Sequence, residues 1–351
     1  MNIKRNSIAD LLKGIAVVLM ILVHVVEKFS SDKVLTSKGG KLVLFLGGPP
    51  VAPVFMILMG YFIASSKKTS SHLVQRGIGL LVGGFLLNIA INTNLFISIN
   101  QGMFNLDPLP YLLGVDIFHF AGLSMILIAL IRNSLLKHYR ITIVGIIISG
   151  LLSTFLIQFN PGILFLKYVC SFFFGISEWS YFPLFPWLVY PLSGFLFFQL
   201  EQKGIQNLIQ TNSFNLAIGV VFLLFGVWSI NYAIEVSANL QAYYHHGFIF
   251  IAWVLFFVIG YGLFIERLNH VFGNSKVFLL LKWMGKHLTI IYIFQWIIIG
   301  NLTTALFKTI DSTLVLGIYT IVILLISSAV AFLYAQIKAN HQQIQSRNKI
   351  T

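Results

Sequence analysis

The chain has 351 residues, of which 58% are apolar and only 9% charged, and its formal net charge is +13. This composition, with a mean hydropathy of +0.88, excludes an ordinary soluble domain and indicates an integral membrane protein. The single cysteine, Cys170, excludes an intramolecular disulfide.

Apolar runs of roughly 20 residues, long enough to cross a bilayer core about 30 Å thick, recur along the chain. Asp10 and Lys13 interrupt the first run, so we expect a retained helix rather than a cleaved signal peptide. We expect one transmembrane domain over residues 1–337 and a short, flexible polar tail over 338–351. The expected fold is all-α and polytopic, with about ten transmembrane helices near 8–28, 43–65, 77–98, 112–131, 141–159, 182–200, 214–234, 247–265, 288–307 and 313–337.

The basic residues orient this bundle. When the chain is threaded alternately through the membrane, 17 of the 23 Lys and Arg residues fall on the side of the N-terminus and 6 on the other. Because cytoplasmic loops carry an excess of Lys and Arg, we expect both termini in the cytoplasm and the protein in the cell membrane. The net charge then reflects this bias and an anionic-ligand site, and we expect no nucleic-acid binding.

Asp10, Lys13 and His24 share one stripe of the first predicted helix. At 100° per residue, Lys13 lies about −60° and His24 about −40° around the helix from Asp10. Because each ionisable group inside a bilayer costs roughly 2.5–3.5 kcal/mol, the three are expected to face a pathway or a reaction site within the bundle. The alternative for His24 is a hydrogen bond to a neighbouring carbonyl.

The other polar and aromatic residues near the membrane boundaries fall into two layers. The outer layer contains His24, residues 47–50, Asp116, His119, residues 181–187 and residues 243–246. The inner layer contains Asp10, Lys13, Arg76, Lys286 and His287. His245 and His246, beside two tyrosines, are expected to belong to an interfacial aromatic belt.

Asp116 and His119 are three residues apart at a predicted helix start, so a carboxylate and an imidazole could meet there as an acid–base pair. The alternative is a capping carboxylate and an interfacial histidine. Lys13 and Arg76 could contact phosphates near the inner boundary. For Arg76 and Lys286, snorkelling toward lipid headgroups is an equal alternative. The sequence has no paired cysteines and no H-E-x-x-H, and we expect no metal.

Five segments in chain order resemble motifs of membrane-bound acyltransferases. Asp10 to Ala16, followed by His24, is similar to their opening D-x-L-R-G-x-A…H, and Pro53 to Gly60 resembles their second-span P-x-F-x-F-x-x-G. The segments similar to G-I-L-H-F-I-G-L-S, Y-F-P-L-x-P-W…G and L-G-K-x-S-L-x-I-Y are Asp116 to Ser124, Tyr181 to Gly194 and Met284 to Tyr292. The chain resembles the bacterial heparan-α-glucosaminide N-acetyltransferase-like branch most, which is related to the acyltransferase-3 family. Two departures are Lys13, where relatives have arginine, and Phe294-Gln295, where many have H-Q.

The resemblance implies acyl transfer across a membrane. Acyl-CoA, with acetyl as the expected acyl group, would be used from the cytoplasm, and a hydroxyl or amine of an extracytoplasmic sugar or glycan would accept the acyl group. His24 would be the general base, and Asp116 with His119 a second base or an acceptor-orienting pair. The residues expected to bind CoA are Lys13, Arg76 and Lys286, with Asp10 restraining Lys13. Direct transfer and an acyl-histidine intermediate both stay open.

Two other classes compete with an enzyme. A transporter or flippase of a sugar-lipid or small solute could use the glycine and proline breaks at 47–53 and 183–191 as a substrate site without covalent chemistry. A structural or assembly partner would need none of the buried charges. A homo-oligomer also stays open, because lipid-facing surfaces and helix interfaces share one composition.

Overall fold

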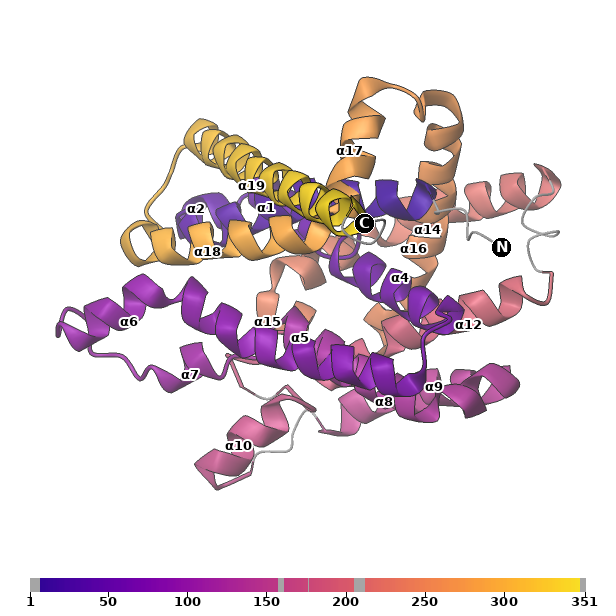
Figure 1. Ribbon diagram of the computed structural model, residues 1–351, viewed down its shortest axis with the longest axis horizontal. Helices are drawn as coiled ribbons and strands as arrows, with labels where there is room; N and C mark the ends of the chain where they lie inside the picture. The colour runs from indigo at the N-terminus through magenta and orange to yellow at the C-terminus, as the bar shows by residue number, and fades with distance from the viewer. Residues whose placement is uncertain (1–6, 157–160, 176, 205–211, 348–351) are drawn as a thin grey trace.

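The structure is a computed structural model that describes residues 7–156, 161–175, 177–204 and 212–347 (Figure 1). Nine of the helices or helix pairs in these residues are long and apolar enough to cross a membrane. The predicted all-α, polytopic class is therefore confirmed. The elements that make these crossings are α1 (Ser7–Phe29), α3 and α4 (Lys38–Gly47 and Ala52–Ser65), α5 (Ser70–Ile91), α8 (Ile117–Lys137), α9 (Tyr139–Leu156), α14 (Asn212–Ala238), α16 (Phe248–Phe272), α18 (Leu288–Leu306) and α19 (Thr313–Arg347).

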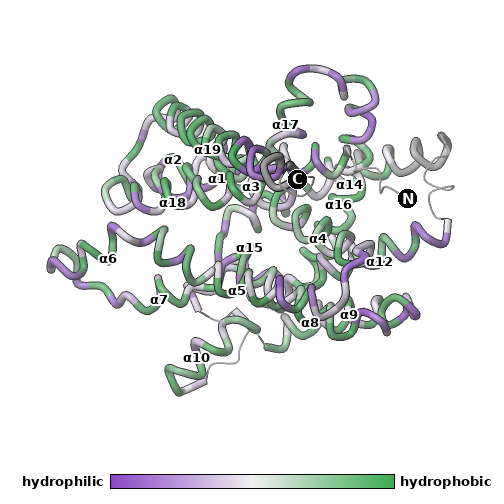
Figure 2. The backbone as a smooth tube through the Cα atoms, in the orientation of Figure 1, coloured by the Kyte–Doolittle hydropathy of each residue, from purple (hydrophilic) through white to green (hydrophobic). Residues whose placement is uncertain are grey.

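Shorter helices connect or extend the crossings. In Figure 1, α6 and α7 lie together at the end of the molecule away from the N-terminus. Apolar residues dominate the long helices, whereas polar residues gather in the connections (Figure 2). The shorter elements are α2 (Asp32–Leu35), α6 (Thr93–Asn100), α7 (Leu109–Leu112), α10 (Leu164–Ser171), α11 (Leu184–Trp187), α12 (Val189–Glu201), α15 (Leu240–Tyr244) and α17 (Lys276–Lys286).

Proline and glycine interrupt two of the predicted crossings. The run predicted at 43–65 divides into α3 and α4 around residues 48–51, and a proline occupies the first turn of α4. The run predicted at 182–200 divides into α11 and α12, and Phe185 between them has non-helical backbone angles. Because α12 has only 13 residues, a single continuous helix there is wrong. Prolines remove backbone donors and clash with the preceding turn, which explains the break.

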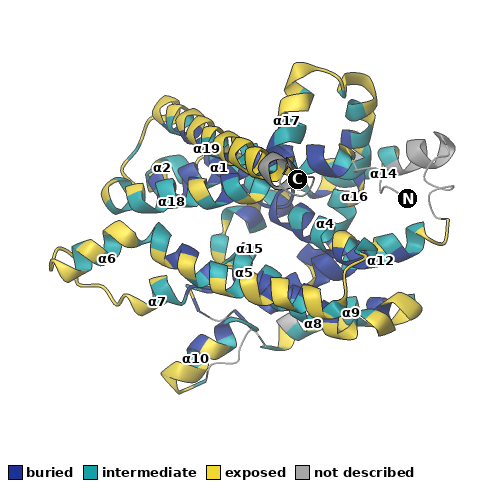
Figure 3. Cartoon of the chain, viewed as in Figure 1, coloured by how far each residue is buried: buried dark blue, intermediate teal, exposed yellow. Residues whose placement is uncertain are grey.

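Close backbone contacts hold the helices together. A Cβ atom on Gly60 of α4 would lie 1.8 Å from the Pro191 carbonyl oxygen of α12, and one on Gly14 of α1 would lie 1.8 Å from the Leu281 oxygen of α17. Small residues let helices approach this closely in a membrane, where dispersion contacts replace the hydrophobic effect. As Figure 3 shows, α1 and α4 are largely buried, while α5, α9 and α19 expose wide surfaces.

Two segments differ from the sequence-based expectation. The sequence predicts a connection where the structure has the short helix α17, which packs on α1. The polar residues at both ends of α17 favour the prediction of a loop. The polar segment expected as a flexible tail continues α19 as far as Arg347. Its Ala, Gln and Lys residues are good helix formers, and extending an existing helix avoids the cost of a new nucleus. The last four tail residues lie outside the described part.

Candidate active site

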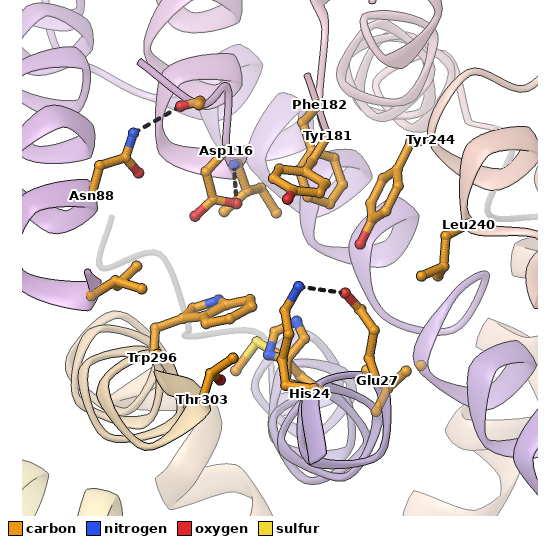
Figure 4. A pocket seen from close by; sticks show the side chains of 18 of the residues that line it. His24, Glu27, Asn88, Asp116, Tyr181, Phe182, Leu240, Tyr244, Trp296 and Thr303 are labelled. Atoms are coloured by element: carbon orange, nitrogen blue, oxygen red, sulfur yellow. Dashed lines mark hydrogen bonds and ion pairs between the residues drawn. The ribbon is translucent and has the colours of Figure 1, made fainter. Parts of the chain in front are cut away.

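A cavity of about 740 Å³ lies at the end of the bundle that the basic residues assign to the outside. Its walls include the last turns of α1 and α5, the starts of α4 and α8, α15, and α18 from Tyr292 onward. In Figure 4, Asn88 lies on one side of the cavity and Leu240 on the other, with His24 between them. The cavity size falls within the usual range for small-ligand sites.

His24 is the predicted residue that the structure places in this cavity from α1. Its ring packs against Trp296 of α18, with centroids 4.1 Å apart and the ring planes tilted by 35°. Its Nδ1 lies 3.2 Å from Oε1 of Gln295. With that amide oxygen as acceptor, Nδ1 carries the ring proton and Nε2 keeps its lone pair. A neutral imidazole held in this tautomer can accept a proton from a bound nucleophile.

An ion pair that the sequence motifs do not predict lies one helical turn after His24 on α1. Glu27 Oε1 is 2.8 Å from Lys28 Nζ, and the side chains are 7% and 22% exposed. The ammonium also lies over the rings of Tyr181, at 5.7 Å, and Trp296, at 6.0 Å. A buried charge needs such partners, because desolvation without them costs several kcal/mol. The pair therefore places one anion and one cation beside His24.

Asp116 enters the cavity from the start of α8, as predicted from its place at a helix start. Its Oδ1 accepts the Ile117 N–H at 2.7 Å, and its Oδ2 accepts the hydroxyl of Tyr292 at 2.5 Å. The first bond caps α8, which is the alternative role, that of a capping carboxylate, stated for Asp116 in the sequence analysis. The second bond joins α8 to α18 and lies on the cavity wall, because both Asp116 and Tyr292 line it.

His119 is placed differently. Its Nδ1 accepts the backbone N–H of Asp116 at 3.2 Å, as the reciprocal half of a capping box. The ring is fully buried, packs against Phe85 and Phe172, and is not part of the cavity wall. The imidazole thus bonds to a backbone amide rather than to the Asp116 carboxylate. This geometry corrects the expected carboxylate–imidazole contact, while the catalytic role of His119 stays a prediction.

The inner layer forms no part of this cavity. Lys13 Nζ is 2.9 Å from Asp10 Oδ1 and lies 5.6 Å from the centre of the Phe62 ring. Arg76 and Lys286 are exposed. Of the described residues that line the cavity, none is one of these four. The structure therefore confirms the expected restraint of Lys13 by Asp10, and it groups neither Arg76 nor Lys286 with them.

A buried apolar layer separates the two levels. The innermost α1 residue of the cavity is Met20, about 10 Å along the axis from Lys13 at 1.5 Å per residue. Met20 packs with Ala16, Val51, Leu87 and Tyr292 in one buried cluster. The cavity that holds His24 therefore does not include Lys13, and this cluster lies between the two residues along α1. The continuous tunnel from Lys13 to His24 stays a prediction.

Two histidines expected in an aromatic belt are instead buried structural groups. His246 Nε2 bonds to the Tyr190 hydroxyl at 2.8 Å, and its Nδ1 donates to the Tyr243 carbonyl at 2.6 Å. His245 Nε2 bonds to the Ser180 carbonyl at 2.8 Å. Loss of hydration on burial lowers the pKa of His246 to about 4, so this loop residue is neutral near pH 7. Together these bonds fix the turn that brings Tyr243 and Tyr244 to the cavity.

Four important cavity residues were missed or undervalued by sequence reasoning. Glu27 and Lys28 sit three and four positions after His24, a spacing that places them near the same helical face and could have marked them. Trp296 lies 272 positions after His24 in the chain, and Tyr292 lies 176 positions after Asp116. Their pairing with His24 and Asp116 is a tertiary contact, for which one sequence contains no local signal.

The comparisons with known proteins address the family. A family profile described as an acyltransferase domain, that of the acyltransferase-3 family, matches residues 6–332. The chain belongs to this family. It is therefore a multi-pass membrane protein of an acyltransferase family, in agreement with the resemblance of its five motifs. No curated protein and no solved structure matches the chain.

Proposed function

We propose that this acyltransferase moves an acyl group, with acetyl as the expected one, from cytoplasmic acyl-CoA to a hydroxyl or amine of an extracytoplasmic sugar or glycan at the cell membrane. The observation that carries the proposal is the position of His24. It lies in a cavity at the expected outer end, packed against Trp296 and oriented by Gln295. An oriented, neutral imidazole beside a space of ligand size is the minimum that general-base catalysis needs.

In the proposed reaction, His24 Nε2 removes the proton from the acceptor hydroxyl as its oxygen attacks the thioester carbonyl. An ester bond forms, the carbon–sulfur bond breaks, and the imidazolium returns the proton to the CoA thiolate. Glu27 interacts electrostatically with His24, and its negative charge stabilises the transient imidazolium. A general base of this kind contributes on the order of 10²–10⁴-fold.

The donor would approach from the inner level. Of the inner cations, Lys13 on α1 is the best candidate to bind a CoA phosphate, because its ammonium is partly buried and held by Asp10. A CoA phosphate could exchange with the Asp10 carboxylate there. The buried cluster around Met20 lies between the two levels, so the proposal requires α1, α4 and α18 to separate locally when acyl-CoA binds.

Purified protein incubated with radiolabelled acetyl-CoA and a panel of sugars tests this function. The proposal predicts equal amounts of acetylated sugar and free CoA. Movement of a sugar-lipid across a vesicle membrane without CoA release would contradict it and favour the transporter class.

A further inference from the structure

One arm of the cavity contains two buried hydroxyl groups without partners. This α15 arm is lined by Gly47, Gly48, Ser237, Leu240, Tyr243 and Tyr244. In the described part of the chain, neither Ser237 Oγ nor the Tyr243 hydroxyl has a hydrogen-bond partner. Leaving a buried polar group unsatisfied costs free energy, so each such group requires an explanation.

Ser237 differs from three other buried serines at or in long helices. Ser30, Ser229 and Ser327 each donate to the carbonyl four residues earlier, at 2.6, 2.6 and 2.7 Å. That bond is the usual solution for a serine inside a helix. The Ser237 hydroxyl, on a residue only 1% exposed, does not make it. Its orientation therefore leaves it free to bond elsewhere.

Tyr243 differs in the same way from two other buried tyrosines. The hydroxyls of Tyr190 and Tyr292 bond to His246 and Asp116. The Tyr243 hydroxyl has no such partner, although its backbone carbonyl is held by His246. Its ring also contacts Gly48, where an added Cβ would lie 3.0 Å from Tyr243 Cε2. The backbone of Tyr243 is thus held in place, while its hydroxyl is left able to bond a ligand.

The charges of the cavity restrict what can occupy this arm. Among the described residues that line the cavity, three carry carboxylates, Glu27, Asp116 and Glu178, and one carries an ammonium, Lys28, which is already paired with Glu27. An anionic ligand would meet this excess of negative charge and be disfavoured. A neutral ligand rich in hydroxyl groups meets aromatic faces and free hydroxyls instead.

We infer that the α15 arm is an acceptor subsite, in which Ser237 and Tyr243 hydrogen-bond hydroxyl groups of a neutral glycan while the reacting group lies at His24. Figure 4 shows Leu240 of this arm across the cavity from Asn88, with His24 between them. The arm is thus offset from the base, as a subsite for a second sugar unit must be. Both oxygens are covered in this structure, so the side chains around them rotate when the acceptor binds. The inference rests on the proposed function.

The test compares wild-type protein with Ser237→Ala and Tyr243→Phe, using acetyl-CoA and maltotriose as probes. Each variant should raise the acceptor KM about 3- to 10-fold, which corresponds to ~0.7–1.4 kcal/mol, and leave the acetyl-CoA KM unchanged. The melting temperature should stay the same or rise, because an unsatisfied hydroxyl contributes nothing to folding. A merely structural role predicts a lower melting temperature and unchanged KM values, which would overturn the inference.

Ser229→Ala is the matched control on the same helix. Ser229 Oγ accepts from Trp253 Nε1 at 2.8 Å, and Ser229 does not line the cavity. Its loss should lower the melting temperature and leave the acceptor KM unchanged. A lower KM of the wild type for the anionic oligogalacturonate than for maltotriose would contradict the inference that the ligand is neutral.

A failure of the proposed function can be told apart from a failure of this subsite. If the wild type transfers acetyl to no sugar, the proposed function fails. Maltotriose should then still raise the melting temperature of the wild type without acetyl-CoA, but not that of the Ser237→Ala, Tyr243→Phe double variant. If maltotriose shifts both proteins equally or neither, the subsite is disproved.

Discussion

The outer and inner halves of α1 carry ionisable residues on one stripe, yet the bundle treats them in opposite ways. Around His24, Glu27 and Lys28 the neighbouring helices separate and leave a cavity. Around Asp10 and Lys13 they close, and Gly14 and Gly285 bring α1 and α17 into backbone contact. The difference teaches that a shared helical face does not imply a shared compartment, because the size of the facing residues decides whether space remains.

Replacing His24 with alanine should have the largest effect. If the outer half of α1 is the reaction centre, His24→Ala should lower kcat/KM about 10²–10⁴-fold, with little change in melting temperature because the ring borders a cavity. Radiolabelled acetyl transfer measures the rate. Full activity in His24→Ala together with a loss in His119→Ala would move the reaction centre to α8.

The contact between α1 and α17 should be the most sensitive part of the inner half. An added methyl group at Gly14 would lie 1.8 Å from the Leu281 carbonyl oxygen. Gly14→Ala should therefore destabilise the protein by roughly 1–3 kcal/mol, as overpacking does, in a thermal unfolding assay. Gly83→Ala is the control, since nothing lies within 4 Å of its added Cβ. Equal stability of the two variants would show that the inner half is not closely packed.

Replacing Lys13 sharpens the comparison by asking whether the inner half binds the donor. Lys13→Ala should raise the KM for acetyl-CoA about tenfold, equivalent to ~1.4 kcal/mol, and change kcat little. Arg76→Ala and Lys286→Ala serve as controls, because both side chains are exposed; each should change the same KM less than about twofold. A larger effect at Arg76 than at Lys13 would place CoA beside α5 instead.

The smallest effect is expected at His119, near the cavity but outside its wall. Glutamine can replace histidine as the third residue of a capping box, so His119→Gln should keep near-wild-type stability. His119→Ala should lose roughly 1–2 kcal/mol, the scale of a lost cap. Both should retain kcat/KM within about threefold of wild type per folded molecule. A large loss of activity in the stable glutamine variant would restore His119 as a catalytic candidate.

Much of the fold could be predicted from the sequence because bilayer thickness imposes the length of each apolar run. The breaks at 47–50 and 183–191 were also visible, since proline and glycine act locally. The complete division of this run into α11 and α12 could not be predicted from the prolines alone, because whether a proline bends or ends a helix depends on what packs beside it. Helix α17 was missed because its interface with α1 depends on Gly14 and Gly285, which are far apart in the chain.

The candidate site was only partly predictable for a related reason. His24 and Asp116 could be found from their positions at helix ends, and both line the cavity. Phe294 replaces the histidine of the H-Q motif, and the sequence assigns no role to Gln295 beside it, yet the Gln295 side chain orients His24. His119 was read as a partner of a carboxylate, but a backbone amide, which every residue carries, takes that place. Sequence spacing shows which groups can meet and not which ones do.

The most direct test of the account uses proteoliposomes that contain the protein in one orientation. Labelled acetyl-CoA is supplied on the side of the termini, and a membrane-impermeant neutral glycan on the opposite side. The account predicts acetylated glycan on the side of the cavity with wild-type protein, and a loss of about 10²–10⁴-fold with His24→Ala. Acetylation only when both substrates share one side, or undiminished transfer by His24→Ala, would contradict it.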